Sequence, residues 1–347
     1  MVRGRATGPC LLLLVLVAAG CSSSPSRRAT PRPTPAPTST STTAPSAPGG
    51  YPLTGLPIDD PRRAARPALT VKIENEPLAR PQSGLQAADV VYEELIEGGD
   101  TRFVAIFQST DADPVGSIRS VRPTDPFVVG PVGGLFAYSG GTAKFVAALH
   151  SVSIVDVGVS AAPGAYFQRP EKAPDHRLFS STPRLYAAPG AAGAKPPPPL
   201  FTFVPPGSPF APSTASPASH VDVLVGIQHV AYDWDPAVGW RRSIGGRPHV
   251  VEGGAQLAPT NVIVQFVSWV PSPGDVDTLG SPVVVAQLVG AGDAWILSGG
   301  KVVKGHWAKA NRDAVTTYTG PDNQPIALTP GRTWVELAPT GTPATVR

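Results

Sequence analysis

Two short apolar runs, residues 90–96 and 103–108, enclose the sequence Glu97-Gly98-Gly99-Asp100. A Gly-Gly pair between such runs is typical of a β-hairpin. In the second run, Phe103, Ala105 and Phe107 fall on one face of an extended chain, and Arg102, Val104, Ile106 and Gln108 fall on the other. This period of two predicts a half-buried strand. A third run, residues 115–121, predicts another strand, which Pro123 should end.

The rest of residues 51–186 has the pattern of a mixed α/β domain. Residues 68–74 and 135–138 are apolar and predict strands. The second of these leads into Ser139-Gly140-Gly141, and Thr142 is placed to cap a helix before a further strand at 153–159. This order predicts a βαβ unit, in which the glycine turn leaves backbone N–H groups free to hold an anion.

The pattern changes after residue 186. Residues 187–218 are rich in proline and predict a stiff linker, although 200–203 is apolar enough for an edge strand. Residues 219–340 contain short β runs with hairpin turns at Gly245-Gly246 and Gly299-Gly300, and little helical periodicity. The predicted fold is α+β, with an N-terminal mixed α/β domain followed by a mainly-β C-terminal domain.

The start of the chain predicts export and a lipid anchor. Residues 1–20 form a leader with a basic start and an apolar stretch at 11–19 that is too short to cross a bilayer. Small residues lie directly before Cys21, as in the lipobox of bacterial lipoproteins, whose cysteine is acylated after the leader is removed. The alternative is an ordinary secretory leader with an incidental cysteine. Residues 21–50 then predict a disordered tether, which places the folded part at the extracytoplasmic face of the cell membrane.

Charge and cysteine content exclude several functions. Five of the 28 basic residues lie in residues 1–48, which contain no acid, so the remaining chain has 23 basic and 25 acidic residues. A near-neutral folded part does not predict nucleic-acid binding. Cys10 leaves with the leader and Cys21 would be acylated, so the mature fold would have no thiol for a disulfide, a nucleophile or a metal site. The scattered histidines lack metal-ligand spacing, and neither a metal nor a cofactor is predicted.

Three arginines are the best candidates for a site. If the predicted strands pair in antiparallel order, Arg102, Arg119 and Arg122 meet at one end of a sheet, where guanidinium groups suit phosphate or carboxylate ligands. Ser139, Gly140 and Gly141 could add backbone donors, and His176 lies in a polar loop that could join the site. The alternatives are ion pairs between the arginines and Glu93, Glu94, Glu97 or Asp125, a purely structural glycine turn, and a structural or surface histidine.

The order of several segments is characteristic of one family. VKIENEP, GSIRSVRP, YSGG and APDHRLFSS in the first part, and GWRRSIGGRPHV in the second, resemble the YerB-like bacterial lipoproteins. The resemblance covers nearly all of residues 52–340. It implies two domains of uncharacterised function and an envelope location, but no activity.

Our leading hypothesis is therefore a membrane-anchored binding or accessory protein of the cell envelope. Its partner would be an anionic envelope ligand or another envelope protein. The alternative is an enzyme that acts on phosphate-linked cell-wall precursors, because arginines on an extracytoplasmic α/β sheet resemble those of the LytR-CpsA-Psr phosphotransferases. No catalytic motif supports that alternative.

Overall fold

The computed structural model describes residues 49–347. The predicted leader, Cys21 and nearly all of the predicted tether lie outside these residues. Four short α-helices are present: α1 (Pro61–Ala65), α2 (Asp125–Val129), α3 (Ala143–Leu149) and α4 (Thr182–Tyr186). None of the helices in the described part of the chain is long and apolar enough to cross a membrane.

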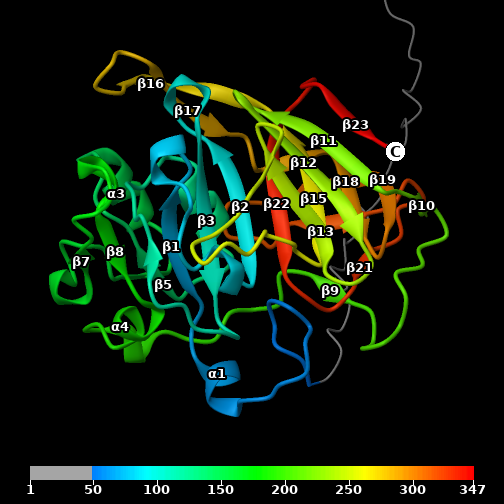
Figure 1. The fold of residues 1–347 in the computed structure, drawn as a ribbon, viewed down its shortest axis with the longest axis horizontal. Coiled ribbons are helices and arrows are strands. Elements are labelled where there is room, and N and C mark those ends of the chain that lie inside the picture. The colour runs from blue at the N-terminus through cyan, green and yellow to red at the C-terminus, as the bar shows by residue number, and fades with distance from the viewer. Residues whose placement is uncertain (1–48) are drawn as a thin grey trace, which may run out of the picture. The chain divides into compact units, whose positions relative to one another are not determined.

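One large sheet of eleven strands runs through both halves of the described chain (Figure 1). Its order is β10 (Ser216–Pro217), β19 (Lys301–Lys309), β18 (Gly290–Ser298), β15 (Asn261–Val267), β22 (Thr333–Pro339), β2 (Val90–Leu95), β3 (Thr101–Phe107), β1 (Leu69–Glu74), β5 (Leu135–Ala137) and β6 (Val155–Asp156), with β20 (Thr317–Thr319) beside β19. Strand β22 pairs in parallel with both β15 and β2. It therefore joins strands of the C-terminal half to strands of the N-terminal half.

The remaining strands form smaller sheets. A five-stranded sheet has the order β14 (Arg247–Pro248), β13 (Gly239–Ile244), β12 (Gln228–Asp235), β11 (His220–Val225) and β23 (Ala344–Val346). The others are β16 (Trp269–Val276) with β17 (Pro282–Ala286), β21 (Ala327–Leu328) with β9 (Thr202–Phe203), and β4 (Val115–Gly116) with β8 (Leu178–Ser180) and β7 (Phe167–Gln168). The predicted fold class, mixed α/β followed by mainly β, is confirmed.

The predicted hairpin is present as β2 and β3, which pair in antiparallel order with Glu94 opposite Arg102. The prediction that the second strand is half-buried is wrong, because every residue of β3 is buried. Phe103, Ala105 and Phe107 belong to one hydrophobic core, which the five-stranded sheet covers. Val104 and Ile106 belong to a second core on the opposite face, covered by α2 and α3. The central strands of the sheet are thus buried on both faces.

The third predicted strand, residues 115–121, is present but much shorter than predicted. Only Val115–Gly116 forms a strand, and it pairs with β8. The physical reason is that β3 lies between β1 and β2, and β5 occupies the outer edge of β1 at Leu69–Val71, which leaves room only for an isolated antiparallel bridge between Ile73 and Ile118. Arg119 and Arg122 consequently lie in a loop. The backbone N–H of Arg119 still donates to the carbonyl oxygen of Lys72 in β1, at 2.9 Å, and this bond holds the loop against the sheet.

The predicted βαβ unit is confirmed. Strands β5 and β6 pair in parallel on either side of α3 in the sequence. The Thr142 side chain accepts a hydrogen bond from the backbone N–H of Phe145, which caps the helix as predicted.

The proline-rich stretch 187–218 contributes β9 and β10 and buries Leu200, Phe201, Phe203 and Phe210. It therefore packs against the core along part of its length. The predicted boundaries at residues 186 and 219 stay a prediction, since the two halves share one sheet.

Candidate functional site

Two adjacent glutamates in β2, Glu93 and Glu94, mark two buried clusters of charged residues. Both side chains are fully buried. Glu93 does not lie at an exposed strand edge, because β2 is an inner strand between β22 and β3. Successive side chains of a strand point to opposite faces of a sheet. Glu93 therefore lies on the face covered by the five-stranded sheet, and Glu94 on the face covered by α2.

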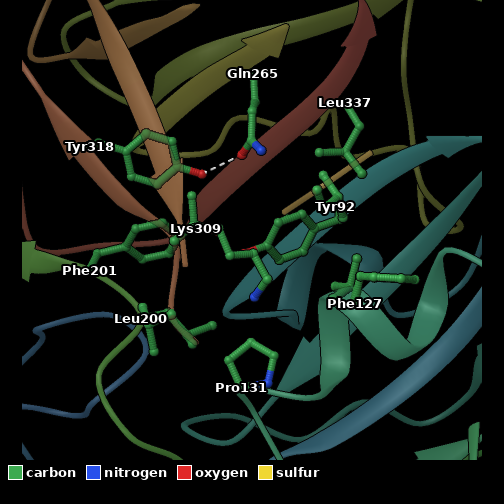
Figure 2. Close-up of a pocket in the computed structure, with 13 residues that line it drawn as sticks. Tyr92, Phe127, Pro131, Leu200, Phe201, Gln265, Lys309, Tyr318 and Leu337 are labelled. Atoms are coloured by element: carbon green, nitrogen blue, oxygen red, sulfur yellow. Dashed lines mark hydrogen bonds between the residues drawn. The ribbon is translucent and has the colours of Figure 1, made fainter. Parts of the chain in front are cut away.

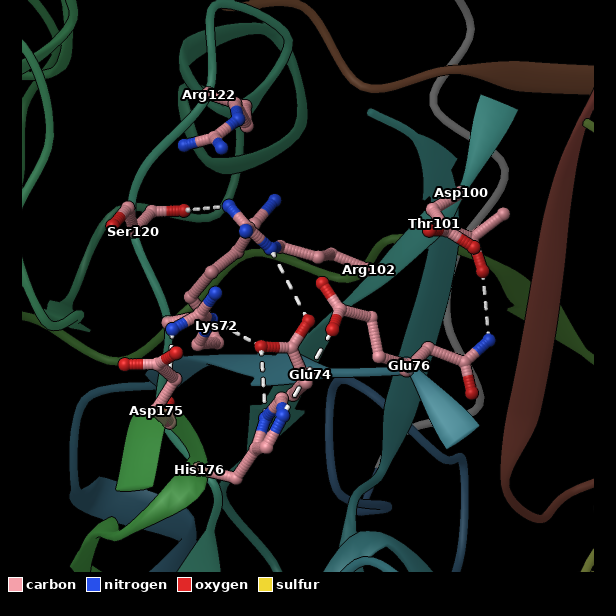
Figure 3. Close-up of polar contacts among 12 residues, drawn as sticks. Lys72, Glu74, Glu76, Asp100, Thr101, Arg102, Ser120, Arg122, Asp175 and His176 are labelled. Carbon is pink, nitrogen blue, oxygen red and sulfur yellow. Dashed lines mark hydrogen bonds and ion pairs between the residues drawn. The ribbon is translucent and has the colours of Figure 1, made fainter. Parts of the chain in front are cut away.

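We call the group on the Glu94 face the arginine cluster. It consists of Lys72, Glu74, Glu94, Glu97, Arg102, Arg119, Arg122 and Asp125. Figure 3 labels Lys72, Glu74, Arg102 and Arg122 of this group. The Nε atom of Arg102 lies 3.7 Å from Oε1 of the fully buried Glu74, and Nε of Arg119 contacts Oε2 of the same carboxylate. The Nε atom of Arg122 lies 2.7 Å from Oε1 of Glu97. The three arginines therefore come together around two carboxylates.

Sequence reasoning thus found the three arginines but only part of their surroundings. Glu97 was among the proposed acidic partners and does pair with Arg122. Asp125 instead lies 2.8 Å from the ammonium group of Lys72, which also contacts Glu94. Glu74, the partner of the other two arginines, was missed. The sequence pattern that could have indicated Glu74 is the alternation in β1, where Thr70, Lys72 and Glu74 alternate with apolar residues and therefore lie on one face of the strand.

The Ser139-Gly140-Gly141 turn lies beside the loop that carries Arg119. The N–H of Ser139 donates to the carbonyl oxygen of Arg119 at 3.0 Å, and the N–H of Val121 donates to that of Gly140 at 2.9 Å. A Cβ atom on Gly141 would lie 2.5 Å from Cγ1 of Val121, so only glycine permits this approach. The turn therefore holds the arginine loop in place, and the N–H of Ser139 is already used inside the protein.

His176 also lies at this cluster, although its short 3₁₀ helix (Pro174–His176) was predicted to be a loop. It is buried rather than on the surface. Its Nδ1 atom lies 3.6 Å from Oε2 of Glu74, and its Nε2 atom lies 3.9 Å from Oε2 of Glu76. The preceding residue, Asp175, accepts a hydrogen bond on its carbonyl oxygen from Nη1 of Arg119 at 2.9 Å. The histidine loop therefore closes one side of the arginine cluster.

Burial shifts the proton affinities of two groups in the cluster. The pKa of Arg102 is lowered to about 10, mainly by burial and also by the neighbouring positive charge of Arg122, while the negative charge of Glu74 opposes the shift. Burial also raises the pKa of Glu94 to about 7; the negative charge of Asp125 adds to this effect and Lys72 opposes it. Part of the cluster thus changes its charge near neutral pH.

The second group, on the Glu93 face, is the Arg242 cluster: Glu93, Tyr232, Arg242, His249 and Glu336. Arg242 is fully buried, and its guanidinium contacts Glu93 and His249 and lies 3.5 Å from Oε1 of Glu336. Its Nε atom donates to the hydroxyl of Tyr232 at 3.1 Å, and its Cζ atom lies 4.8 Å from the centre of the Trp334 ring. This cluster ties β13 of the C-terminal half to β2 and β22, and its burial indicates a structural role.

Within residues 49–347, no three His, Cys, Asp or Glu side chains are grouped so that they could share a metal ion. Two cavities in the same residues, one lined in part by Leu200 and Phe201 and the other in part by Pro209 and Pro212, contain no residue of the arginine cluster in their walls. The arginine cluster is therefore a surface site at the end of β1, with Arg119 and Arg122 partly exposed and Arg102 beneath them.

Comparison with known proteins identifies the family. Residues 53–195 match the N-terminal domain, and residues 221–335 the C-terminal domain, of a family described as "Protein of unknown function (DUF3048)". The chain belongs to the DUF3048 family. A relative in Bacillus subtilis (strain 168), "Putative lipoprotein YerB", is 28% identical over 300 residues, which are 83% of this chain and 86% of that protein. The crystal structure of the YerB protein from Bacillus subtilis is similar, with a TM-score of 0.72 and 25% identity over 85% of this chain and 99% of that chain. The predicted membership of a YerB-like family is confirmed.

Proposed function

We propose that this DUF3048 protein is a lipid-anchored protein of the cell envelope that binds a singly charged oxyanion, such as a phosphodiester, at the arginine cluster. The anchor is supported by the small residues before Cys21 and by the name of the Bacillus subtilis relative, which calls that protein a lipoprotein. The binding function is carried by one observation, which is the set of guanidinium donors that the protein itself leaves unused.

Each of the three arginines keeps such a donor. The recorded hydrogen bonds use Nη1 of Arg102, Nη1 of Arg119, and Nε and Nη1 of Arg122. The Nη2 atoms of all three have no hydrogen-bond partner within the described residues. Hydrogen bonds between charged groups and an oxyanion are short and about twice as strong as those between neutral groups. Three unused donors, on arginines from two chain segments of one cluster, therefore form a suitable site for an oxyanion.

The balance of charge limits the ligand. The eight side chains of the arginine cluster include four cationic groups and four carboxyl groups, so the cluster has no net charge when Glu94 is ionised and one positive charge when Glu94 is protonated. Glu76 and Asp175 lie nearby and oppose any further negative charge. A ligand with one negative charge suits this site, whereas pyrophosphate would bring more negative charge than the site can balance. The acidic residues of the site should therefore favour anions with a single charge over anions with several charges.

Binding can be tested on Arg119, whose side chain is partly exposed. We expect a glycerol phosphodiester to bind the wild-type protein more tightly than pyrophosphate does. Arg119→Gln should weaken the diester at least tenfold, because a hydrogen bond to a charged group contributes about 1.5–3 kcal/mol. The matched control is Arg62→Gln, since Arg62 is exposed and pairs with the neighbouring Asp60. Isothermal titration at constant ionic strength measures both.

Two results would contradict the proposal. The first is that no diester binds the wild-type protein while Arg119→Gln lowers its melting temperature, which would make Arg119 only the ion-pair partner of Glu74. The second is that Arg119→Gln and Arg62→Gln bind the diester equally well.

The enzymatic alternative has one observation in its favour, because buried His176 lies between Glu74 and Glu76 in the same cluster. Histidine beside carboxylates can transfer protons. Phosphorus NMR of the same titration distinguishes the two functions: an intact diester supports binding, and a growing monoester signal would establish hydrolysis.

A further inference from the structure

A small cavity lies under the proline-rich stretch, away from the arginine cluster. Its volume is about 20 Å³, enough for one or two water-sized groups. The walls are mainly apolar and come from both halves of the chain: Phe127, Val128, Pro131, Leu200, Phe201, Leu288, Val315 and Leu337. Figure 2 shows Lys309 between the rings of Tyr92 and Phe201, with Gln265 and Tyr318 close by.

Lys309 is unusual among the lysines of β19. The strand alternates, so Lys304 is exposed while Lys309 is 97% buried. Its ammonium group donates to the carbonyl oxygen of Ala314, and no carboxylate of residues 49–347 lies within ion-pair distance of it. Burial lowers the pKa of Lys309 to about 8, and Asp313 opposes the shift from a distance. A buried ammonium without a carboxylate partner is costly, and an anion in the cavity would offset that cost.

The other polar groups of the cavity are also donors. The Tyr318 hydroxyl donates to Oε1 of Gln265 at 2.7 Å, which leaves the Nε2 amide group of Gln265 without a partner in the described residues. The Tyr92 hydroxyl has no hydrogen-bond partner there either, and burial raises the pKa of Tyr92, so it keeps its proton. An ammonium, an amide N–H and a hydroxyl therefore line the cavity, and the side chains add no free carboxylate to it.

We propose that this cavity binds the carboxylate of a small organic acid, with Lys309 as its counter-ion and Tyr92 and Gln265 as further donors. A carboxylate accepts hydrogen bonds on both oxygens and carries the single charge that the site lacks. Phe127, Leu200 and Phe201 would contact the apolar body of the acid. The volume restricts the ligand to the size of formate or acetate in this conformation. The proposal uses none of the arginine-cluster residues and is independent of the function proposed above.

The test compares sodium formate and acetate with formamide and acetamide, which have nearly the same shapes but no charge. Binding to the full chain is followed by NMR titration with isotope-labelled ligand. We expect each acid to bind at least tenfold more tightly than its amide. Lys309→Met, which keeps the volume and removes the charge, should abolish the difference. Tyr92→Phe should weaken the acid about threefold to tenfold, as the loss of one hydrogen bond predicts. Lys304→Met, on the exposed face of the same strand, should bind acetate like the wild type.

The pH dependence gives a second measurement that does not rely on a variant. Binding needs the protonated Lys309, so the affinity for acetate should fall as the pH rises through the lysine pKa of about 8. Three results would overturn the proposal: equal affinity for acetate and acetamide, undiminished acetate binding by Lys309→Met, or an acetate affinity that does not change between neutral and alkaline pH.

Discussion

Replacing Arg242 by Met should be one of the most damaging single changes in this fold. Met has a similar length and no charge, so Arg242→Met removes the charge while keeping most of the packing against Trp334. It leaves the fully buried carboxyl groups of Glu93 and Glu336 without their cationic partner. Removing one partner of a buried ion pair costs about 3–5 kcal/mol. That is a large part of the free energy of unfolding of a typical protein, which is roughly 5–15 kcal/mol.

The stability lost in Arg242→Met should depend on pH, and the ionisation of Glu336 determines the direction of this dependence. Burial and the nearby Glu93 raise the pKa of Glu336 well above its ordinary value, and Arg242 opposes this shift. Without Arg242 the folded-state pKa rises further. A carboxyl group whose pKa is raised by folding favours the folded state at low pH, and this contribution is lost as the pH rises through the folded-state pKa. Arg242→Met should therefore be more destabilising at about pH 8 than at about pH 5.5.

Urea unfolding followed by tryptophan fluorescence measures both effects. The matched control is Arg241→Met, because Arg241 is the adjacent residue, is half exposed and pairs with Asp235. Exposed ion pairs contribute only about 0–1 kcal/mol. Adding Glu93→Gln to Arg242→Met should restore part of the stability, since it removes one of the two stranded carboxyl groups. The reasoning is refuted if the two arginine variants lose equal stability, or if Arg242→Met is more harmful at the lower pH.

Two further changes test the start of the chain and a backbone contact. Cys21→Ala should leave the precursor uncleaved and unlabelled by a fatty-acid analogue; continued labelling of this variant would show that Cys21 is not the lipidated residue. Gly226→Ala should lower the melting temperature at least twice as much as Gly245→Ala. Both glycines have positive φ, +63° and +57°, but a Cβ atom on Gly226 would lie 2.0 Å from the carbonyl oxygen of Gly99, whereas one on Gly245 meets nothing within 4 Å. Equal melting temperatures would mean that the Gly226 turn moves freely away from the β2–β3 turn.

Local sequence was sufficient for those parts of the fold that local forces determine. The β2–β3 hairpin follows from two apolar runs around Gly98-Gly99, and α3 follows from the cap at Thr142. Pairing between distant strands has no such local signal. Nothing in residues 115–121 shows that β3 is already paired on both sides and that β5 occupies part of the outer edge of β1, and nothing in residues 333–339 shows that this strand lies beside β2. Burial of both faces of β3 depends on the same distant pairings.

The candidate site was predictable to a similar degree. The arginines converge as predicted, but Arg119 and Arg122 reach the cluster through a loop held by Lys72 and Ser139 rather than through a strand. The missing information was again long-range. In the sequence, Glu74 looks like the polar end of a strand. Only the tertiary structure shows that Arg119 and His176 contact it. The burial of Arg242 was not foreseeable either, because its neighbour Arg241 has the same chemistry and is half exposed.

The position of β22 affects when the large sheet can finish folding during synthesis of the chain. A protein chain is synthesised from its N-terminus, so β2 is made more than two hundred residues before its neighbour β22. Until then the edge of β2 that β22 will cover has unpaired backbone groups, which is the kind of edge that recruits foreign strands. A chain cut short before Thr333 would keep that edge open. The N-terminal half is therefore expected to depend on β22, and truncation of the chain just before Thr333 should destabilise both halves.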